Sequence, residues 1–279
     1  MPIKRGKKED NGKGSLEQMV SENGYNNMTK VMVVGDIHAP FQDKKNLDIT
    51  RQFMKDYKPN VFVFNGDVID FYSISKYDKS PARKENLESE IESANYCIDY
   101  LLKGISKDAK KYFLEGNHEY RLQSFIWKNP AFYGLEVVDI KNLLGLDRRG
   151  IKMIRGAGDY WKKQSRLKIG DTMIMHGDNR LDGASSSKNS GYSVSNTMKT
   201  MLSNVVMGHI HRGAVVYQTT PNGILTGVEG GKLCQDTGTA NWQSGFTTFE
   251  VERTKGHNFR FHHIDKGKLY ENGKIYKSK

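Results

Sequence analysis

Short apolar segments that end in turns carrying Asp, Asn or His constrain this chain more than any other feature of its sequence. Residues 31–34 and 61–64 are uninterrupted apolar runs, which is typical of strands buried on both faces of a parallel sheet. A helical pattern over residues 45–57 lies between them, so the three segments form a β-α-β unit. Because the carboxyl ends of parallel strands meet at one edge of a sheet, we expect the turns to lie together there.

Five ligand-rich turns of this kind occur along the chain. They are Gly35-Asp36-Ile37-His38, Gly66-Asp67, Gly116-Asn117-His118-Glu119, His176-Gly177-Asp178 and Gly208-His209-Ile210-His211. Five of the eight histidines lie in these turns, a concentration that core packing does not explain. Carboxylates, imidazoles and an amide oxygen form a mixed set of donors suited to Mn, Fe, Zn or similar divalent ions. The turns contain no cysteine, which argues against a structural zinc site of the Cys type.

In their order along the chain, these turns resemble the motifs of the calcineurin-like metallophosphoesterase superfamily. The resemblance spans about residues 30–212. It implies a four-layer α/β/β/α sandwich of two mixed sheets flanked by helices, in which the strand-rich part after residue 212 supplies the second sheet. It also implies hydrolysis of a phosphoester by a metal-bound hydroxide that attacks phosphorus.

The resemblance implies two divalent metal ions and a set of seven ligands for them. Two ions about 3.5–4 Å apart suit in-line displacement at phosphorus. Mn is the first expectation, with Fe, Zn, Ni or Co as alternatives. Asp67 would bridge the ions, with Asp36, His38 and His211 on one and Asn117, His176 and His209 on the other.

His118 would remain unbound to metal and face the leaving oxygen, as a proton donor or as a charge stabiliser. The resemblance puts Asp70 where it would orient His118 through a hydrogen bond, whereas an Asp at this position could instead cap backbone amides. Arg121, one helical turn after His118, and Arg212, next to His211, are candidates for binding the substrate phosphate. The alternative for each arginine is a solvated surface position.

The substrate class is predicted from charge and from one departure from the family pattern. The net charge is +11 and is concentrated in residues 1–14 and 253–279, which favours a polyanionic partner such as nucleic acid or else keeps the chain soluble. The loop at residues 72–84 mixes tyrosines with Lys and Arg and could contact nucleic acid. Many protein Ser/Thr phosphatases of the superfamily have Asp-Arg-Gly where this chain has Asp70-Phe71-Tyr72.

We therefore expect a phosphodiesterase or nuclease acting on a phosphodiester, nucleic-acid or nucleotide substrate. The alternative is a phosphomonoesterase that acts on nucleotides or phosphoproteins. A more remote alternative is a non-catalytic binding module. That module would be expected to lack His118 or the bridging ligand, and this chain has both.

The chain is expected to form a basic flexible N-terminal arm (1–28) and a single metallophosphoesterase domain (29–279) with a β-rich C-terminal part. Further helices are expected over residues 85–102, 137–144 and 193–202, and hairpin turns at Gly170-Asp171 and Asn272-Gly273. The chain lacks a long apolar run and a signal-like start, so we expect a cytoplasmic protein without a membrane partner. Cys97 and Cys234 are expected to be reduced, partly buried thiols. The oligomeric state is left open.

Overall fold

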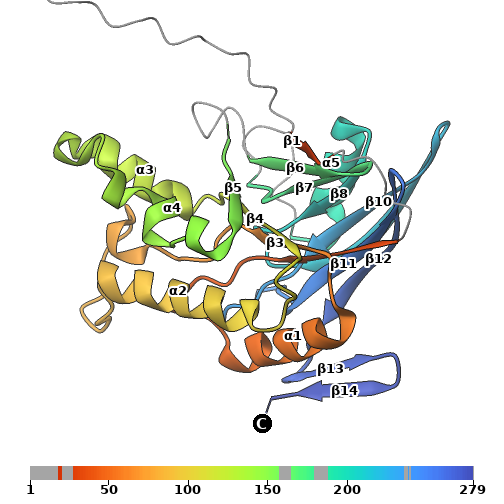
Figure 1. Cartoon of the computed structure of the whole chain (residues 1–279), viewed down its shortest axis with the longest axis horizontal. Coiled ribbons are helices and arrows are strands. Elements are labelled where there is room, and N and C mark those ends of the chain that lie inside the picture. Colours follow the sequence, from red (N-terminus) through yellow and green to blue (C-terminus); the bar gives the residue numbers. More distant parts are fainter. Residues whose placement is uncertain are drawn as a thin grey trace, which may run out of the picture.

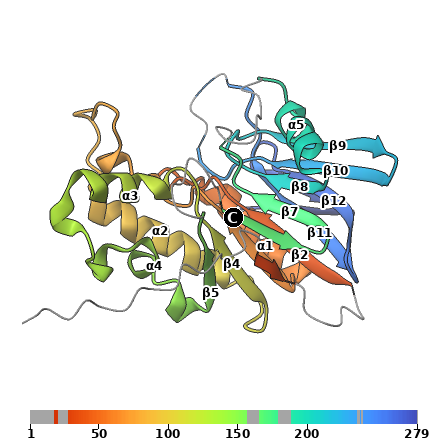
Figure 2. The same cartoon turned by 90° about the horizontal axis from the view of Figure 1, so that it is seen from above.

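The computed structural model describes residues 18–20, 28–156, 165–178, 188–235, 238 and 240–278. Two six-stranded sheets are stacked face to face, and helices cover the outer face of each (Figure 1, Figure 2). The predicted four-layer α/β/β/α sandwich is thereby confirmed. None of the helices within these residues has both the length and the apolar character needed to cross a bilayer.

The first sheet has the strand order β12-β11-β2-β3-β4-β5. Its strands are β2 (Thr29–Val34), β3 (Val61–Asn65), β4 (Lys110–Leu114), β5 (Ile151–Ile154), β11 (Gly245–Glu252) and β12 (Lys255–His263). Strands β2 to β5 are parallel, as the buried apolar runs of β2 and β3 predict, and β11 is antiparallel to β2. The carboxyl ends of β2, β3 and β4 therefore meet at one edge.

The second sheet has the strand order β1-β6-β7-β8-β10-β9. Its strands are β1 (Gln18–Val20), β6 (Arg166–Ile169), β7 (Thr172–Met175), β8 (Asn204–Met207), β9 (Gly213–Thr220) and β10 (Gly223–Gly230). Strands β7, β8 and β10 are parallel, so their carboxyl ends also share an edge. The predicted turn at Gly170-Asp171 joins the antiparallel strands β6 and β7.

Helices cover the two sheets unequally. Those on the first sheet are α1 (Lys44–Tyr57), α2 (Leu87–Leu102), α3 (Glu119–Lys128) and α4 (Ile140–Leu143), whereas α5 (Tyr192–Met201) covers the second (Figure 2). Asp43 caps α1 by accepting hydrogen bonds from the backbone N–H groups of Lys45 and Asn46. Asn86 and Ser89 form a capping box that begins α2.

Alternation along the strands separates three apolar layers. In β2, Met32 faces the cluster that contains α1 and α2, whereas Val31 and Val33 face the cluster between the sheets. A third cluster lies under α5, where Val194 and Met198 pack on the second sheet. Because successive side chains of a strand point to opposite faces, an uninterrupted apolar run fills two layers at once.

The C-terminal strands correct one expectation, because they do not all belong to the second sheet. Strands β9 and β10 join that sheet, but β11 and β12 extend the first one. Strand β11 pairs with β2 from Thr247 opposite Val33 to Val251 opposite Thr29. This pairing satisfies the backbone groups on the outer side of β2, which is buried and could not be left as an open edge.

Two further segments differ from their predicted form. The helix expected over residues 137–144 is limited to α4, because Asp139 has an extended backbone and caps α4 after a 3-10 turn at Glu136–Val138. Within the predicted arm 1–28, Gln18–Val20 forms strand β1, which pairs with β6, and residues 1–17 and 21–27 lie outside the described part of the chain. The other predicted helices and hairpins are present.

The C-terminal hairpin of β13 (Lys268–Glu271) and β14 (Lys274–Lys277) packs beside α1 (Figure 1). Phe53 of α1, which is 4% exposed, lies at the centre of this contact, with ring centroids 5.0 Å from Phe246, 4.6 Å from His262 and 5.7 Å from Tyr276. This aromatic cluster connects the hairpin to the first sheet.

We predict that Phe53→Ala lowers the free energy of unfolding by about 3–5 kcal/mol, the usual cost of removing a buried aromatic ring. Lys55→Ala, at an exposed position of the same helix, is the control and should change it little. Urea unfolding monitored by circular dichroism measures both variants. Equal stabilities for the two would contradict the central position of Phe53.

Candidate metal centre

The five ligand-rich turns converge at the shared edge of the two sheets. Backbone hydrogen bonds join them in pairs: the N–H of Asp36 donates to Gly66 O (3.1 Å), that of His38 to Asp67 O (2.9 Å), and that of Gly208 to His176 O (2.9 Å). The first two bonds connect the ends of β2 and β3, and the third connects the ends of β7 and β8. The sheet topology therefore brings together residues that are up to 175 positions apart, from Asp36 to His211.

Five residues of these turns have a left-handed backbone, with φ between 49° and 68°. They are Asp36, His38, Asp67, His209 and His211. A residue with a Cβ atom rarely adopts this conformation, at a cost of about 1–3 kcal/mol, and such residues cluster at functional sites. All five are predicted metal ligands, so the strain coincides with the candidate site.

The first predicted ligand set has nitrogen atoms that face one another. His38 Nε2 lies 3.0 Å from His211 Nε2, which lies 3.2 Å from Asp36 Oδ1, and Asp67 Oδ2 is 3.7 Å from His38 Nε2. Two imidazole nitrogens and two carboxylate oxygens directed at one point offer more acceptors than donors. A divalent cation would satisfy all of them, so these residues fit a metal ion.

The second predicted set is arranged around His176. Its Nε2 lies 3.1 Å from both Asp67 Oδ2 and Asn117 Oδ1, and His209 offers a nitrogen within 4.8 Å of the ligand atoms of His176 and Asp67. His209 Nδ1 is buried and has no hydrogen-bond partner in the described part of the chain. Asp67 Oδ2 and Asn117 Oδ1 can only accept hydrogen bonds. His176 Nε2 must therefore carry a proton or bind a metal ion in order to interact favourably with both. These residues also fit an ion, and Asp67 is common to both sets.

Neighbouring groups orient two of the histidines. His38 Nδ1 lies 3.0 Å from Asp70 Oδ1, and His176 Nδ1 lies 2.8 Å from Asn65 O. An oxygen at Nδ1 holds the proton on that nitrogen and leaves Nε2 to face the ion, as in most metal-binding histidines. Asp70 Oδ1 also lies 3.1 Å from His118 Nδ1, so one carboxylate contacts both rings.

His118 lies beside the predicted ligands. Its Nε2 accepts a hydrogen bond from Arg121 Nη2 at 3.0 Å and is 3.7 Å from Asp67 Oδ2. Arg121 Nη1 donates to the carbonyl oxygen of Asp70 at 2.8 Å, so the guanidinium group connects the two predicted catalytic residues. By distance, His118 could also share an ion with His38 and Asp67, and its role outside the ligand set stays a prediction.

Glu119 braces the backbone of two turns. Its Oε2 accepts hydrogen bonds from the N–H groups of Asp67 and Gly116, both at 2.8 Å. Its Oε1 accepts from Val68 at 2.8 Å and from Ile69 at 3.3 Å. Glu119 is 1% exposed, so these bonds form away from water and hold the Gly66-Asp67 and Gly116-Asn117 turns in register.

The pKa shifts of Asp67 and His176 fit a site made for positive charge, whereas burial lowers the pKa of His38 and of His209. Burial raises the pKa of Asp67, but the charges of His118 and His176 outweigh burial and lower it well below its usual value. Burial lowers the pKa of His176, but the charge of Asp67 and its hydrogen bond raise it to about 10. The carboxylates that stabilise an imidazolium ion here would stabilise a metal cation in the same way.

Other predicted residues lie at different distances from this centre. The charge of Asp178, which is 4% exposed, raises the pKa of His176, so Asp178 lies close to that ring. Burial raises the pKa of Glu229 in β10, and the nearby charge of Arg212 is among the smaller effects that oppose this rise. Asn179 and Arg180, which also follow His176, lie outside the described residues. The phosphate-binding roles of Arg121 and Arg212 stay predictions.

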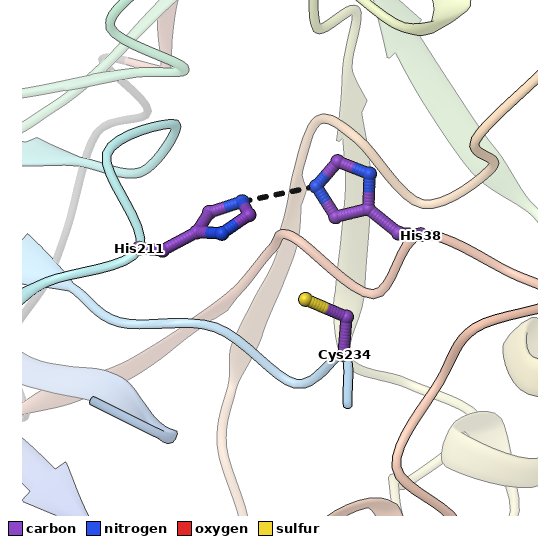
Figure 3. Close-up of side chains that lie close together, drawn as sticks. All are labelled: His38, His211 and Cys234. Carbon is purple, nitrogen blue, oxygen red and sulfur yellow. Dashed lines mark hydrogen bonds between the residues drawn. The ribbon is translucent and has the colours of Figure 1, made fainter. Parts of the chain in front are cut away.

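Two residues at the site were missed by the sequence analysis. Cys234 offers a sulfur atom within 4.8 Å of ligand nitrogens of His38 and His211 (Figure 3), so a thiol that the five turns do not contain lies beside the site. The ring of Trp242 lies 4.7 Å from that of His211, edge to face. No local sequence pattern marks these two residues, because the parallel pairing of β10 with β8 is what brings the chain after Gly230 to the same sheet edge.

A family model described as calcineurin-like phosphoesterase matches residues 29–238. The chain belongs to the calcineurin-like phosphoesterase family. The Gene 54 proteins of Mycobacterium phages D29 and L5 are each 27% identical to it, over 240 and 239 residues, which is 80% of this chain and 89% of each relative. The family thus provides a phosphoesterase fold with divalent-metal sites.

Solved structures with a similar fold include Vps29 proteins. Vacuolar Protein Sorting 29 from Cryptosporidium parvum has a TM-score of 0.42 and 13% identity, covering 89% of this chain and 94% of its own. Wild-type Vps29 from Entamoeba histolytica, solved as a complex with zinc, has a TM-score of 0.45 and 11% identity, covering 87% and 96%. Membership of the phosphoesterase family rests on the match over residues 29–238.

We predict that Glu119→Ala destabilises this phosphoesterase by about 3 kcal/mol or more, because each buried N–H group left unsatisfied costs about 1–3 kcal/mol. Glu88→Ala, at an exposed position in the first turn of α2, is the control and should be nearly neutral. Thermal unfolding of the two variants gives the comparison. A Glu119→Ala protein as stable as the Glu88→Ala protein would show that the brace is dispensable.

Proposed function

We propose that the chain is a dinuclear metal-dependent phosphoester hydrolase with a phosphodiester substrate, preferably in a nucleic acid or nucleotide. The observation that carries the proposal is the arrangement around Asp67. Its carboxylate lies between two groups of ligand atoms, and His118, held by Asp70 and Arg121, lies directly beside it. Two bound divalent ions would polarise the phosphoester and activate a water molecule as nucleophile.

The chain's own residues would divide the remaining work. Asp36, His38 and His211 would hold one ion, Asn117, His176 and His209 the other, and Asp67 would bridge them. His118 Nδ1 lies 2.9 Å from the backbone oxygen of Asp70 and 3.1 Å from its Oδ1, so Asp70 accepts a hydrogen bond from Nδ1 and Nε2 is directed toward Arg121 and Asp67. A phosphoryl group bound here would attract the Arg121 guanidinium away from His118 Nε2 and onto its own oxygen atoms. Burial lowers the pKa of His118, but the charge of Asp67 and the hydrogen bond of Asp70 outweigh burial and raise it, so Nε2 would then take up a proton from solvent and donate it to the leaving oxygen.

A basic and aromatic cavity beside the candidate centre favours a substrate with a base next to its phosphate. The cavity has a volume of about 400 Å³ and opens between Asn117 and the loop after η1 (Tyr72–Ile74). Its lining includes three cations, three aromatic rings and, among the described residues, no carboxylate; they are Lys76, Arg121, Lys128, Tyr77, Tyr120 and Phe125. Stacked bases and a phosphate backbone are recognised by this combination of groups.

The two tyrosines of the loop at residues 72–84 differ in whether their rings are free to stack on a base. Tyr77 is 60% exposed, and Arg121 lies 5.9 Å from its ring. Tyr72 is engaged within the loop, because Arg83 covers its ring at 4.0 Å and its hydroxyl donates to Asp78 O at 2.8 Å. Tyr77 is therefore the ring to which we assign base stacking.

The larger cavity under α3 does not suit a phosphate. It has a volume of about 920 Å³, and its lining includes five carboxylates against two cations. The carboxylates are Glu115, Glu119, Glu136, Asp139 and Asp147. Like charges repel a phosphoester, so the smaller basic cavity is the better substrate site.

The experiment that tests the function compares a phosphodiester and a phosphomonoester of the same leaving group, beside single-stranded and duplex DNA. We expect the metal-loaded protein to hydrolyse the diester faster and a chelator to abolish the activity. Faster hydrolysis of the monoester would instead favour the phosphomonoesterase. Absence of hydrolysis with both ions bound would favour a binding module.

His118→Ala should retain both ions and lower turnover by about 10²–10⁴-fold, the range typical of general acid–base groups. Asp67→Ala should lose bound metal as well as activity, because it removes the shared ligand. His257→Ala, at an exposed position of β12, is the control for replacing a histidine. Near-wild-type turnover of His118→Ala would remove its assigned role, and a fully loaded Asp67→Ala protein would contradict the bridge.

Replacing Lys76 and Lys128 by Ala should weaken binding of single-stranded DNA and reduce the salt slope of log K by about 0.7 for each phosphate that the protein no longer neutralises. Binding is measured by fluorescence anisotropy in the presence of a chelator, so that no strand is cut. The control pair is Lys103→Ala with Lys107→Ala, exposed residues before β4 at the opposite edge of the sheet. Equal salt slopes for the two pairs would rule the cavity out as the nucleic-acid site.

A further inference from the structure

Cys234 is directed into the first predicted metal site. Its sulfur atom and nitrogen atoms of His38 and His211 all lie within 4.8 Å of one another. Figure 3 shows the thiol pointing toward the space between the two imidazole rings. The two ring nitrogens are only 3.0 Å apart, so the three donors surround one small volume.

The backbone of Cys234 is fixed relative to a predicted ligand of that site. Its N–H donates to Asp36 O at 3.1 Å, and its carbonyl oxygen accepts a hydrogen bond from Lys232 Nζ at 2.7 Å. An isolated β-bridge also pairs it with Gln42. Cys234 is 6% exposed and Lys232 is fully buried, so these contacts hold the backbone of Cys234 in place without competition from water.

We propose that Cys234 supplies a thiolate ligand to the ion held by Asp36, His38 and His211, and that this ion is zinc rather than manganese. The proposal rests on the metal centre of the proposed function. Thiolate and imidazole are donors that zinc prefers, whereas manganese prefers carboxylate and water oxygens. Zinc bonds of about 2.3 Å to sulfur and about 2.0–2.1 Å to nitrogen place two such ligand atoms at most about 4.4 Å apart. A small side-chain movement would therefore let Cys234 join Asp36, Asp67, His38 and His211 around one ion. Binding releases the thiol proton to solvent as the metal–sulfur bond forms.

The second predicted site contains no thiol among the described residues, because His176, Asn117, His209 and Asp67 offer only nitrogen and oxygen. The two sites would then differ in their ion preference. One would hold zinc through a sulfur ligand, and the other would accept a harder ion. A mixed pair of ions is therefore the expected composition of the active protein.

The test uses cobalt, which replaces zinc and absorbs in the near ultraviolet when a thiolate binds it. The chain has two cysteines, so any such absorption comes from Cys97 or Cys234. Cys97 is buried in α2, within the core between the helices and the first sheet, and burial raises the pKa of its thiol to about 12. Cys97→Ser is thus the matched control for Cys234→Ser.

We expect the cobalt-loaded full-length protein and Cys97→Ser to show the thiolate absorption and Cys234→Ser to lack it. Zinc affinity of Cys234→Ser should fall by at least the ~10–100-fold that follows loss of groups supporting a metal ligand, whereas manganese affinity should change little. Elemental analysis after gel filtration reports how much cobalt each protein holds.

Each outcome separates the thiolate ligand from the proposed function. Cobalt bound to the wild-type protein without thiolate absorption would overturn the role of Cys234 and leave the metal centre standing. Absorption lost in Cys97→Ser but kept in Cys234→Ser would show that Cys97 is the thiolate and would overturn the assignment to Cys234. Absence of bound cobalt, zinc and manganese from the wild-type protein would overturn the metal centre and this inference together. The wild-type spectrum shows whether a thiolate binds the cobalt even if Cys234→Ser does not fold.

Discussion

Two buried carboxylates hold the candidate metal centre of this protein together. Asp36 and Asp67 are each 1% exposed, and a buried carboxylate is stable only when its oxygen atoms are paired. Both oxygens of Asp36, at the end of the first sheet, lie 3.0–3.1 Å from the backbone N–H of His209 in the second sheet, which donates to them. Asp67 accepts from the backbone N–H of His118 at 2.9 Å. The negative charge that would bind a cation is therefore also the charge that connects the sheets.

Close packing around these carboxylates limits what the turns can contain. A Cβ atom at Gly116 would lie 2.4 Å from Asp67 Oδ1, and one at Gly208 would lie 2.5 Å from Asp36 Oδ2. Glycine is required at both positions because the backbone passes directly over a carboxylate. The left-handed backbone of the neighbouring ligands is maintained by the same hydrogen bonds, with Glu119 as the brace on the first sheet. The strained backbone conformations and the hydrogen bonds of the buried carboxylates thus involve the same few residues.

The residues around the candidate metal centre differ in charge and polarity from one side to the other. Toward α3, Arg121, Lys76 and Lys128 line a cavity with aromatic walls, which suits the phosphate and base of a substrate. Toward β10 and the loop after it, Cys234 and Trp242 lie against His211, which suits selection of the ion. Asp70 connects the two functions, because one of its oxygens contacts both His38, a predicted ligand, and His118, the predicted proton donor.

By itself the sequence determined the fold class, most helices and strands, and which residue types gather at the sheet edge. Apolar periodicity and the glycines at strand ends are local signals, so the β-α-β unit and the five turns could be predicted from them. Only the tertiary structure decided that β11 and β12 extend the first sheet, that Asp70 serves two histidines, and that Cys234 joins the ligand cluster. These features depend on contacts between segments far apart in the chain, and no local sequence pattern indicates such contacts. They also depend on the hydrogen-bond and charge partners that buried strand edges and buried charges require.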